Sequence, residues 1–196
     1  MADEHLTEVS FTNLHLPESL ARGVADAGFE RCTPIQAQTL PRALAGFDIA
    51  GQAQTGTGKT AAFLIALYSR LLRAEIPSTR KINSPLALII APTRELAVQI
   101  HHDAELLGQY TGLKLCLAFG GVDYEKQRRD LEDGVDILIG TPGRLIDFYK
   151  QQVFDLRSVQ VLVLDEADRM FDLGFIADIR YIMRRLPPPD QRLNLL

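Results

Sequence analysis

Short apolar runs alternate along the chain with longer segments in which apolar residues recur at helical spacing. The runs at residues 86–91, 113–119, 135–139 and 159–164 have the length of strands, and a further strand begins near Leu193. Runs rich in Val, Ile and Leu are typical of strands that are buried on both faces. The pattern therefore predicts an α/β domain in which a parallel sheet carries helices on both faces.

Local signals mark the ends of several helices. A helix is predicted over residues 17–27, where a proline opens it and Gly28 ends it. A second helix begins at Pro34, with Thr33 as its N-cap. Two further helical segments are expected at 63–72 and 96–107. An exposed loop that contains two prolines is expected at 73–85.

The stretch Ala53-Gln54-Thr55-Gly56-Thr57-Gly58-Lys59-Thr60 has the features of a loop that binds a nucleoside triphosphate. It follows Ile49-Ala50, which we expect to form a strand, and it opens the helical segment at 63–72. Glycines let successive N–H groups point inward, and the N-terminus of the helix adds positive charge. Lys59 can then reach the β- and γ-phosphates, and the Thr60 hydroxyl can bind Mg²⁺. Because Ala53 stands where the strict pattern has its first glycine, a plain turn before a helix is the alternative for the loop alone.

Acidic residues follow the strand predicted at 159–164, in the order Asp165-Glu166-Ala167-Asp168. The carboxyl ends of parallel strands meet at one edge of a sheet, so these acids are expected beside the phosphate loop. Asp165 would hold Mg²⁺, largely through water, and Glu166 would orient and deprotonate the attacking water. The alternative is a pair of helix N-terminal acids favoured by the helix dipole. The phosphate loop upstream favours the catalytic interpretation.

Gln36 lies in the first turn of the helix that Thr33 caps, and it allows two interpretations. Its amide can return a hydrogen bond to the Thr33 backbone in a capping box. It can also present a donor and an acceptor to adenine, with Phe29 as a stacking plate. Both interpretations stay open locally, and the nucleotide loop downstream favours the second. Phe11, upstream of these residues, is expected to fill a hydrophobic groove.

The composition narrows the class of protein. A chain of 196 residues with 46% hydrophobic and 23% charged residues suits one globular domain. Its net charge is −4, so binding to nucleic acid needs a local patch. The sequence has neither an apolar run near the roughly 20 residues that span a bilayer nor a signal-peptide core. Cys32 and Cys116 lie far apart, and neither they nor His101-His102 have metal-ligand spacing. We expect a cytoplasmic protein with no membrane association.

The motifs together resemble those of the DEAD-box ATP-dependent RNA helicases, over roughly residues 9–196. Asp165 to Asp168 spell the box that names this family, and residues 28–36 resemble its adenine-reading Q motif, with Phe11 as the upstream aromatic. The resemblance implies a three-layer, RecA-like P-loop domain, with a Q-motif region at 9–37 and an ATP-binding core at 38–196. It also implies ATP and Mg²⁺ as cofactors, catalysis by Lys59, Asp165 and Glu166, and contact of Asp168 with a second domain.

Three loops match the RNA-contact motifs of the family, and each follows a predicted strand. Glycine pairs allow a sugar-phosphate backbone to approach closely, while threonine and arginine side chains can bind phosphate oxygens. The loops carry no ladder of aromatic residues, so sequence-independent binding to the RNA backbone is expected. Ordinary turns and helix caps would explain any one loop alone. The three motifs are Pro92-Thr93-Arg94, Gly120-Gly121 and Thr141-Pro142-Gly143-Arg144.

The resemblance further implies a second RecA-like domain, which the 196 residues do not contain, and which closes on ATP and RNA with arginine fingers. We therefore expect the chain alone to hydrolyse ATP barely, whereas the full-length protein couples ATP hydrolysis to separation of RNA strands. An RNA clamp that uses ATP only to lock, and a DNA translocase, are the alternatives. For a bacterial branch of the family, the resemblance also implies an RNA-degrading assembly built on an endoribonuclease.

Overall fold

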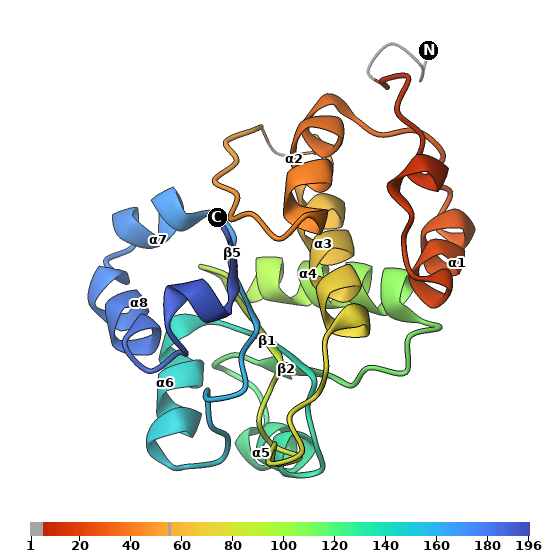
Figure 1. Ribbon diagram of the computed structural model, residues 1–196. Helices are drawn as coiled ribbons and strands as arrows, with labels where there is room; N and C mark the ends of the chain where they lie inside the picture. Colours follow the sequence, from red (N-terminus) through yellow and green to blue (C-terminus); the bar gives the residue numbers. More distant parts are fainter. Residues whose placement is uncertain (1–5, 55) are drawn as a thin grey trace.

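The computed structural model describes residues 6–54 and 56–196, and it is built around a five-stranded parallel sheet (Figure 1). The strand order is β2-β3-β1-β4-β5, and every pair of neighbours is parallel. The strands are β1 (Ala87–Ile90), β2 (Leu115–Ala118), β3 (Ile137–Gly140), β4 (Val161–Leu164) and β5 (Leu193–Leu195). The predicted strand runs are confirmed, and the ends of β1 to β4 differ from the predicted runs by at most two residues.

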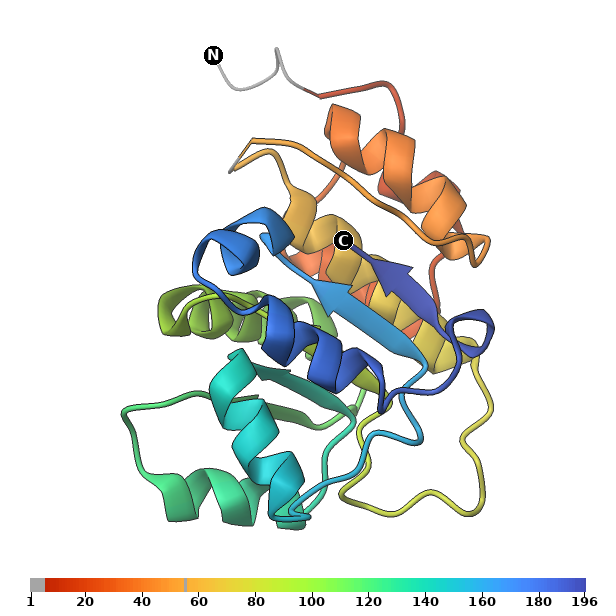
Figure 2. The ribbon, with the colours of Figure 1, turned by 90° about the vertical axis from the view of Figure 1, so that its left-hand side faces the viewer.

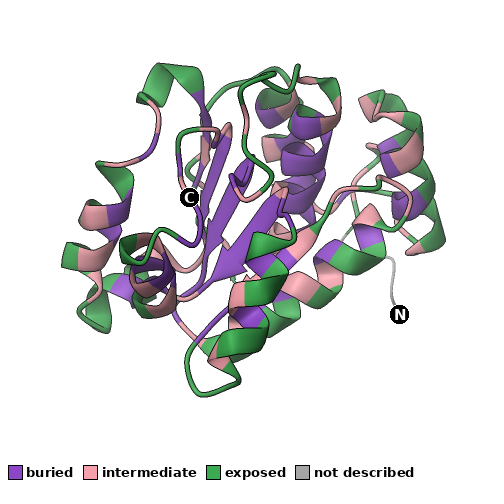
Figure 3. Cartoon of the chain, turned by 90° about the horizontal axis from the view of Figure 1, so that it is seen from below, coloured by how far each residue is buried: buried purple, intermediate pink, exposed green. Residues whose placement is uncertain are grey.

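Helices cover both faces of this sheet, as Figures 1 and 2 show from two directions. Side chains of β1 alternate between two apolar cores: Ala87 and Ile89 face one, and Leu88 and Ile90 face the other. Buried residues of the helices between residues 18 and 108 build the first core, and those of the helices between residues 124 and 183 build the second. Figure 3 shows the strands buried while the helices keep exposed outer sides. The predicted three-layer α/β architecture is confirmed.

The ends predicted from local signals for the first two helices lie within one residue of the observed ends. Thr33 accepts a hydrogen bond from the Gln36 N–H as the N-cap, and Pro34 is the first helical residue. Gly28 follows the helix at 18–26 and has φ +79°, a value that favours glycine. The helices are α1 (Glu18–Asp26), α2 (Pro34–Leu44), α3 (Lys59–Arg73), α4 (Arg94–Gly108), α5 (Tyr124–Glu132), α6 (Pro142–Lys150), α7 (Ala167–Asp172) and α8 (Ile176–Met183), with short 3₁₀ helices at Phe11–Leu14 and Pro189–Gln191.

The prediction of a strand at Ile49-Ala50 is wrong, although this segment lies beside β5, at the edge of the sheet. Only Ile49 forms a parallel bridge, to Leu195 at the edge of the sheet. The following rungs use the backbone, since the Leu196 N–H donates to the Ile49 carbonyl oxygen at 2.9 Å and the Gly51 N–H donates to the Leu196 carbonyl oxygen at 2.8 Å. The rung before Ile49 is taken by a side chain, because the Asn194 N–H donates to Asp48 Oδ1 at 2.7 Å. A side-chain acceptor at this position competes with the backbone ladder. The chain therefore reaches the phosphate loop beside β5 without forming a regular strand.

In the part of the chain that the structure describes, no helix combines the length and apolar character needed to cross a bilayer.

Some elements of the core pack with their backbones in close contact. Gly23 of α1 is one such contact, because a Cβ atom there would overlap the Leu107 carbonyl oxygen of α4.

Replacing Gly23 with alanine is expected to destabilise the fold by about 3 kcal/mol, because backbone atoms must move to admit a methyl group. Gly143→Ala is the matched control, since nothing lies within 4 Å of the added Cβ. Urea unfolding of both variants measures the free energies. A Gly23→Ala protein as stable as the control would show that the packing of α1 on α4 is looser than described.

Candidate functional site

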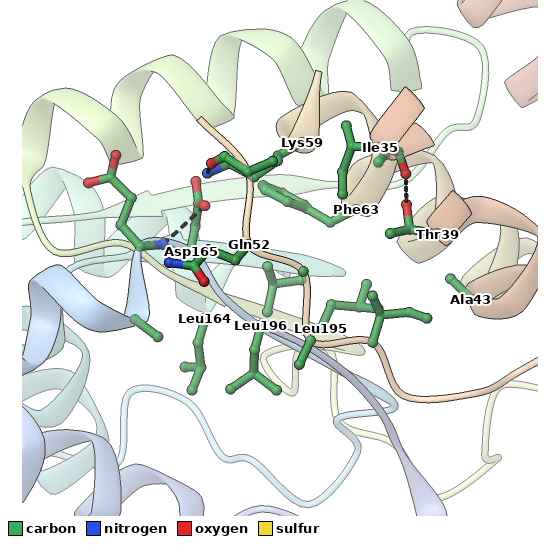
Figure 4. Close-up of a pocket in the computed structure, with 18 of the residues that line it drawn as sticks. Ile35, Thr39, Ala43, Gln52, Lys59, Phe63, Leu164, Asp165, Leu195 and Leu196 are labelled. Atoms are coloured by element: carbon green, nitrogen blue, oxygen red, sulfur yellow. Dashed lines mark hydrogen bonds between the residues drawn. The ribbon is translucent and has the colours of Figure 1, made fainter. Parts of the chain in front are cut away.

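A cavity of about 1110 Å³ opens beside the C-terminal ends of β4 and β5. Its walls come from α2, the segment at 49–54, the first turns of α3, and the residues that follow β4. Lys59 and Asp165, which lie far apart in the sequence, both line it. Figure 4 shows their side chains pointing toward one another, with Phe63 and Thr39 farther along the cavity. The topology thus brings the predicted phosphate loop and the predicted acids to one place.

The phosphate loop bends sharply before α3. Gly56 has φ +83° and Gly58 has φ +91°, so both positions favour glycine. Lys59 begins α3, and its ammonium donates to the Ala53 carbonyl oxygen. The ammonium has two further N–H donors, so a phosphate can bind it beside that bond or in its place. Ala53, Gln54 and Lys59 line the cavity, Thr60 lies in the first turn of α3, and Thr55 lies outside the described residues.

Gln36 makes the capping box and also holds the phosphate loop. Its Oε1 accepts from the Thr33 N–H at 2.9 Å, and its Nε2 donates to the Gly58 carbonyl oxygen at 3.1 Å. The Thr33 hydroxyl donates to the Thr57 carbonyl oxygen at 2.8 Å. The capping-box interpretation is therefore confirmed. Adenine recognition by Gln36 stays a prediction, and it requires the buried amide to exchange partners.

Phe11 and Phe29 pack edge to face, with ring centroids 5.7 Å apart. Phe11 is only 4% exposed and belongs to the core, as the groove-filling interpretation predicts. Phe29 is half-buried, so part of its ring stays accessible. The arrangement lets Phe11 fix the orientation of Phe29, and in this conformation Phe29 is the ring of the pair that can meet a ligand.

The acids after β4 are held in a strained turn. Glu166 has φ +52°, a left-handed conformation that a residue with a side chain seldom adopts outside functional sites. Its N–H donates to Asp165 Oδ1 at 3.1 Å, and its carboxylate pairs with Arg169 at 3.1 Å. Burial, and then the charge of Glu166, raise the pKa of Asp165, while Lys59 opposes the shift. Asp168 is exposed on the rim of the cavity.

Asp165→Asn is expected to stabilise the free protein by about 1 kcal/mol at neutral pH, because ionising a partly buried carboxyl costs free energy. A raised pKa in the folded state means that the wild-type protein loses stability as pH rises through that pKa. At pH below 3.8, the ordinary aspartate value, the carboxyl is neutral in both states and the advantage of asparagine should vanish. Urea unfolding with a chelator present, from acid to neutral pH, measures the difference, with the exposed Asp190→Asn as control. An advantage that grows toward acid pH would contradict the assignment.

The three predicted RNA-contact loops follow β1, β2 and β3 and are linked by side chains. The Arg94 guanidinium lies over the Phe119 ring, 5.0 Å from its centroid. Arg144 lies over the Tyr124 ring at 4.9 Å and donates to Gln127 Oε1 at 3.2 Å. Exposed or half-buried members of the loops are Thr93, Arg94, Gly120, Gly121, Thr141, Gly143 and Arg144, whereas Pro92 and Pro142 are buried and can shape the loops without facing a ligand.

Gln127 and Arg169 were missed by the sequence reasoning. Gln127 is a buried polar residue on α5, and its neighbour one turn later on the same face is the buried Leu131. A glutamine at an apolar position of a polar helix is a signal that could have singled it out. Arg169 gives no comparable signal, because its ion pair with Glu166 depends on the unusual backbone of Glu166.

A parallel sheet in three layers, with a glycine loop before α3 and acids after β4, is the architecture of RecA-like P-loop domains. The sequence model of the DEAD/DEAH box helicase family matches residues 33–196, and the chain belongs to that family. It is similar over all 196 residues to proteins named ATP-dependent RNA helicase RhlB. The identity is 60% for Aliivibrio salmonicida, 59% for Shigella dysenteriae and 60% for Escherichia coli O7:K1. The chain spans 45%, 47% and 47% of these relatives.

Proposed function

We propose that this chain is the ATP- and RNA-binding half of an ATP-dependent RNA helicase, in which ATP hydrolysis drives unwinding or remodelling of RNA duplexes. One observation carries the proposal: Lys59 from the phosphate loop and Asp165 from the end of β4 line the same cavity. The names of the relatives support the reaction and the substrate, because they describe ATP-dependent RNA helicases.

The residues of the cavity fit a triphosphate with Mg²⁺. The free N–H groups at the start of α3 and the Lys59 ammonium supply positive charge for phosphate oxygens. Asp165 and the Thr60 hydroxyl are hard oxygen ligands, and the partly buried Asp165 carboxylate gains from a nearby cation. When bound, Mg²⁺ would neutralise charge that develops on the phosphates. Glu166 would accept a proton from the attacking water.

The Q-motif region, proposed at 9–37, would select the base while the core at 38–196 binds the phosphates. Phe29 would stack on adenine, and the Gln36 amide would leave Gly58 to pair with the edge of the base. Gln36 and Thr33 already contact the carbonyl oxygens of the phosphate loop, so base binding would be transmitted directly to that loop. The rest of the proposed nucleotide contacts come from residues 53–60.

The proposed RNA surface consists of the loops after β1, β2 and β3. Arg94 and Arg144 would bind phosphates, and Gly120-Gly121 would let the RNA backbone approach closely. These contacts carry no base recognition, so binding would not depend on sequence. Asp168, exposed beside the cavity, would meet a second RecA-like domain.

The likeness to the RhlB helicases supports three finer proposals. A second RecA-like domain completes the protein, since the relatives are about twice as long as this chain. The full-length protein works in RNA degradation with an endoribonuclease as partner. It works in the cytoplasm, where the unpaired thiols of the buried Cys32 and Cys116 suit a reducing environment. Co-purification of the full-length protein with an endoribonuclease from a cell lysate tests the second proposal.

The nucleotide preference of the chain tests the adenine assignment. Wild-type protein is expected to bind ATP about tenfold more tightly than GTP, and Gln36→Ala to bring this ratio close to one. Absolute affinities for both nucleotides should fall, because the variant also loses the bond to Gly58. Titration with each nucleotide and Mg²⁺ gives the ratio. A preference that survives in Gln36→Ala would assign base recognition to other residues.

A further inference from the structure

Gln127 joins two of the proposed RNA-contact loops through its side-chain amide. Oε1 accepts from the Phe119 N–H at 3.0 Å, and Nε2 donates to the Phe119 carbonyl oxygen at 3.1 Å. These two bonds fasten the residue that immediately precedes Gly120-Gly121. The same Oε1 accepts from Arg144 Nη1 at 3.2 Å. Gln127 is 8% exposed, so the three bonds form away from competing solvent.

The link extends to the third loop through Phe119. The ring of Phe119 lies under the Arg94 guanidinium, while its backbone is held by Gln127. Gly121, two residues later, has φ +85°, and a Cβ added to it would lie 3.9 Å from Arg94 Nη1. Arg94, the glycine pair and Arg144 therefore belong to one connected cluster, with Gln127 at its buried centre.

We propose that Gln127 is a positioning residue that holds the Gly120-Gly121 loop and Arg144 in the arrangement that binds RNA phosphates. This inference rests on the proposed RNA-binding function and adds to it a residue that does not touch RNA. The mechanism is preorganisation: a guanidinium that is already oriented loses less conformational freedom when it binds a phosphate.

The chemistry of the amide explains why glutamine suits this position. Its oxygen accepts from Arg144 without adding negative charge, so the guanidinium keeps its charge for phosphate. A carboxylate could hold Arg144 equally firmly, but it would neutralise that charge. The rings of Tyr124 and Phe148, which the guanidinium also overlies, likewise orient it without neutralising it.

A double-mutant cycle on RNA affinity tests the proposal in the full-length protein, using a labelled oligouridylate and a non-hydrolysable ATP analogue. Gln127→Leu and Arg144→Met are each expected to weaken RNA binding about tenfold, since each removes hydrogen bonds to a charged group. The double variant should be scarcely weaker than either single variant, because both changes disable the same contact. ATP affinity should stay unchanged. Gln109→Leu, which removes an exposed amide at the C-cap of α4, is the matched control.

Gln127→Glu keeps the test decisive if the leucine variant does not fold. The carboxylate loses the bond that Nε2 donates to the Phe119 carbonyl oxygen, but it can still accept from the Phe119 N–H and pair with Arg144. Because that pair neutralises the guanidinium, the salt dependence of RNA binding should fall by about 0.7 in log–log slope. Independent effects of Gln127 and Arg144, or an unchanged slope in Gln127→Glu, would overturn the inference while leaving the RNA surface intact. Undiminished RNA binding in Arg144→Met would overturn the proposed RNA surface itself.

Discussion

Replacing Glu166 with glutamine is expected to lower RNA-stimulated ATP turnover by the full-length protein about 10³-fold, the range typical of a lost general base. Glutamine preserves the size of the side chain but cannot accept a proton from water. ATP affinity should change little, since the ammonium and N–H groups proposed to bind phosphate are untouched. Steady-state turnover and ATP titration, measured on the same variant, separate the two effects.

The strained conformation of Glu166 makes a structural control necessary. The amide weakens the pair with Arg169, but Arg169 is exposed, and such pairs contribute little to stability. We therefore expect the variant to melt within a few degrees of the wild-type protein. Glu105→Gln, which changes an exposed acid on α4 remote from the cavity, should keep full turnover. Retention of turnover by Glu166→Gln would exclude Glu166 as the base.

The 196-residue chain alone is expected to hydrolyse ATP at least ~10³-fold more slowly than the full-length protein with RNA. The cavity contains Lys59 and Asp165, yet the arginine fingers that stabilise transferring phosphate are proposed to come from the second domain. Such arginines typically raise the rate of phosphate cleavage by a factor on the order of 10³–10⁵. Turnover of the chain and of the full-length protein should be compared at equal ATP and RNA concentrations.

Adding back the second domain as a separate polypeptide distinguishes a missing arginine from a damaged site. Partial recovery of turnover in the mixture would show that the chain retains a competent ATP site. The chain should also bind ATP without RNA. Robust RNA-stimulated turnover by residues 1–196 alone would show that the first domain carries the complete catalytic machinery and would contradict this part of the account.

The strands could be predicted because strands buried on both faces have continuous apolar sequences, such as the run from Leu86 to Ala91. Their common direction predicts that the loops after β1, β2, β3 and β4 share one edge of the sheet. The expectation failed at Ile49, where hydropathy alone favours a strand. Asp48 ends the pairing on the N-terminal side of Ile49, because its carboxylate takes the Asn194 N–H that a regular ladder would use there.

The contacts within the site were less predictable than its location. Spacing places Gln36 in a capping box, but it does not reveal that the other end of the amide reaches Gly58, which is distant in sequence. The α5 helix is polar on most of its surface, and only the helical spacing between Gln127 and the apolar Leu131 indicates that Gln127 is buried. Its three bonds depend on how α5 lies against β2 and α6, and no local pattern encodes that packing.

The proposed function requires that Lys59 and Asp165 bind the same magnesium triphosphate. A crystal structure of the chain with Mg²⁺ and a non-hydrolysable ATP analogue measures this directly. We expect the triphosphate at the N-terminus of α3, the Lys59 ammonium moved from the Ala53 carbonyl oxygen to a phosphate, and Mg²⁺ on the side of Asp165. A triphosphate bound away from this cavity, with Lys59 still bonded to Ala53, would contradict it.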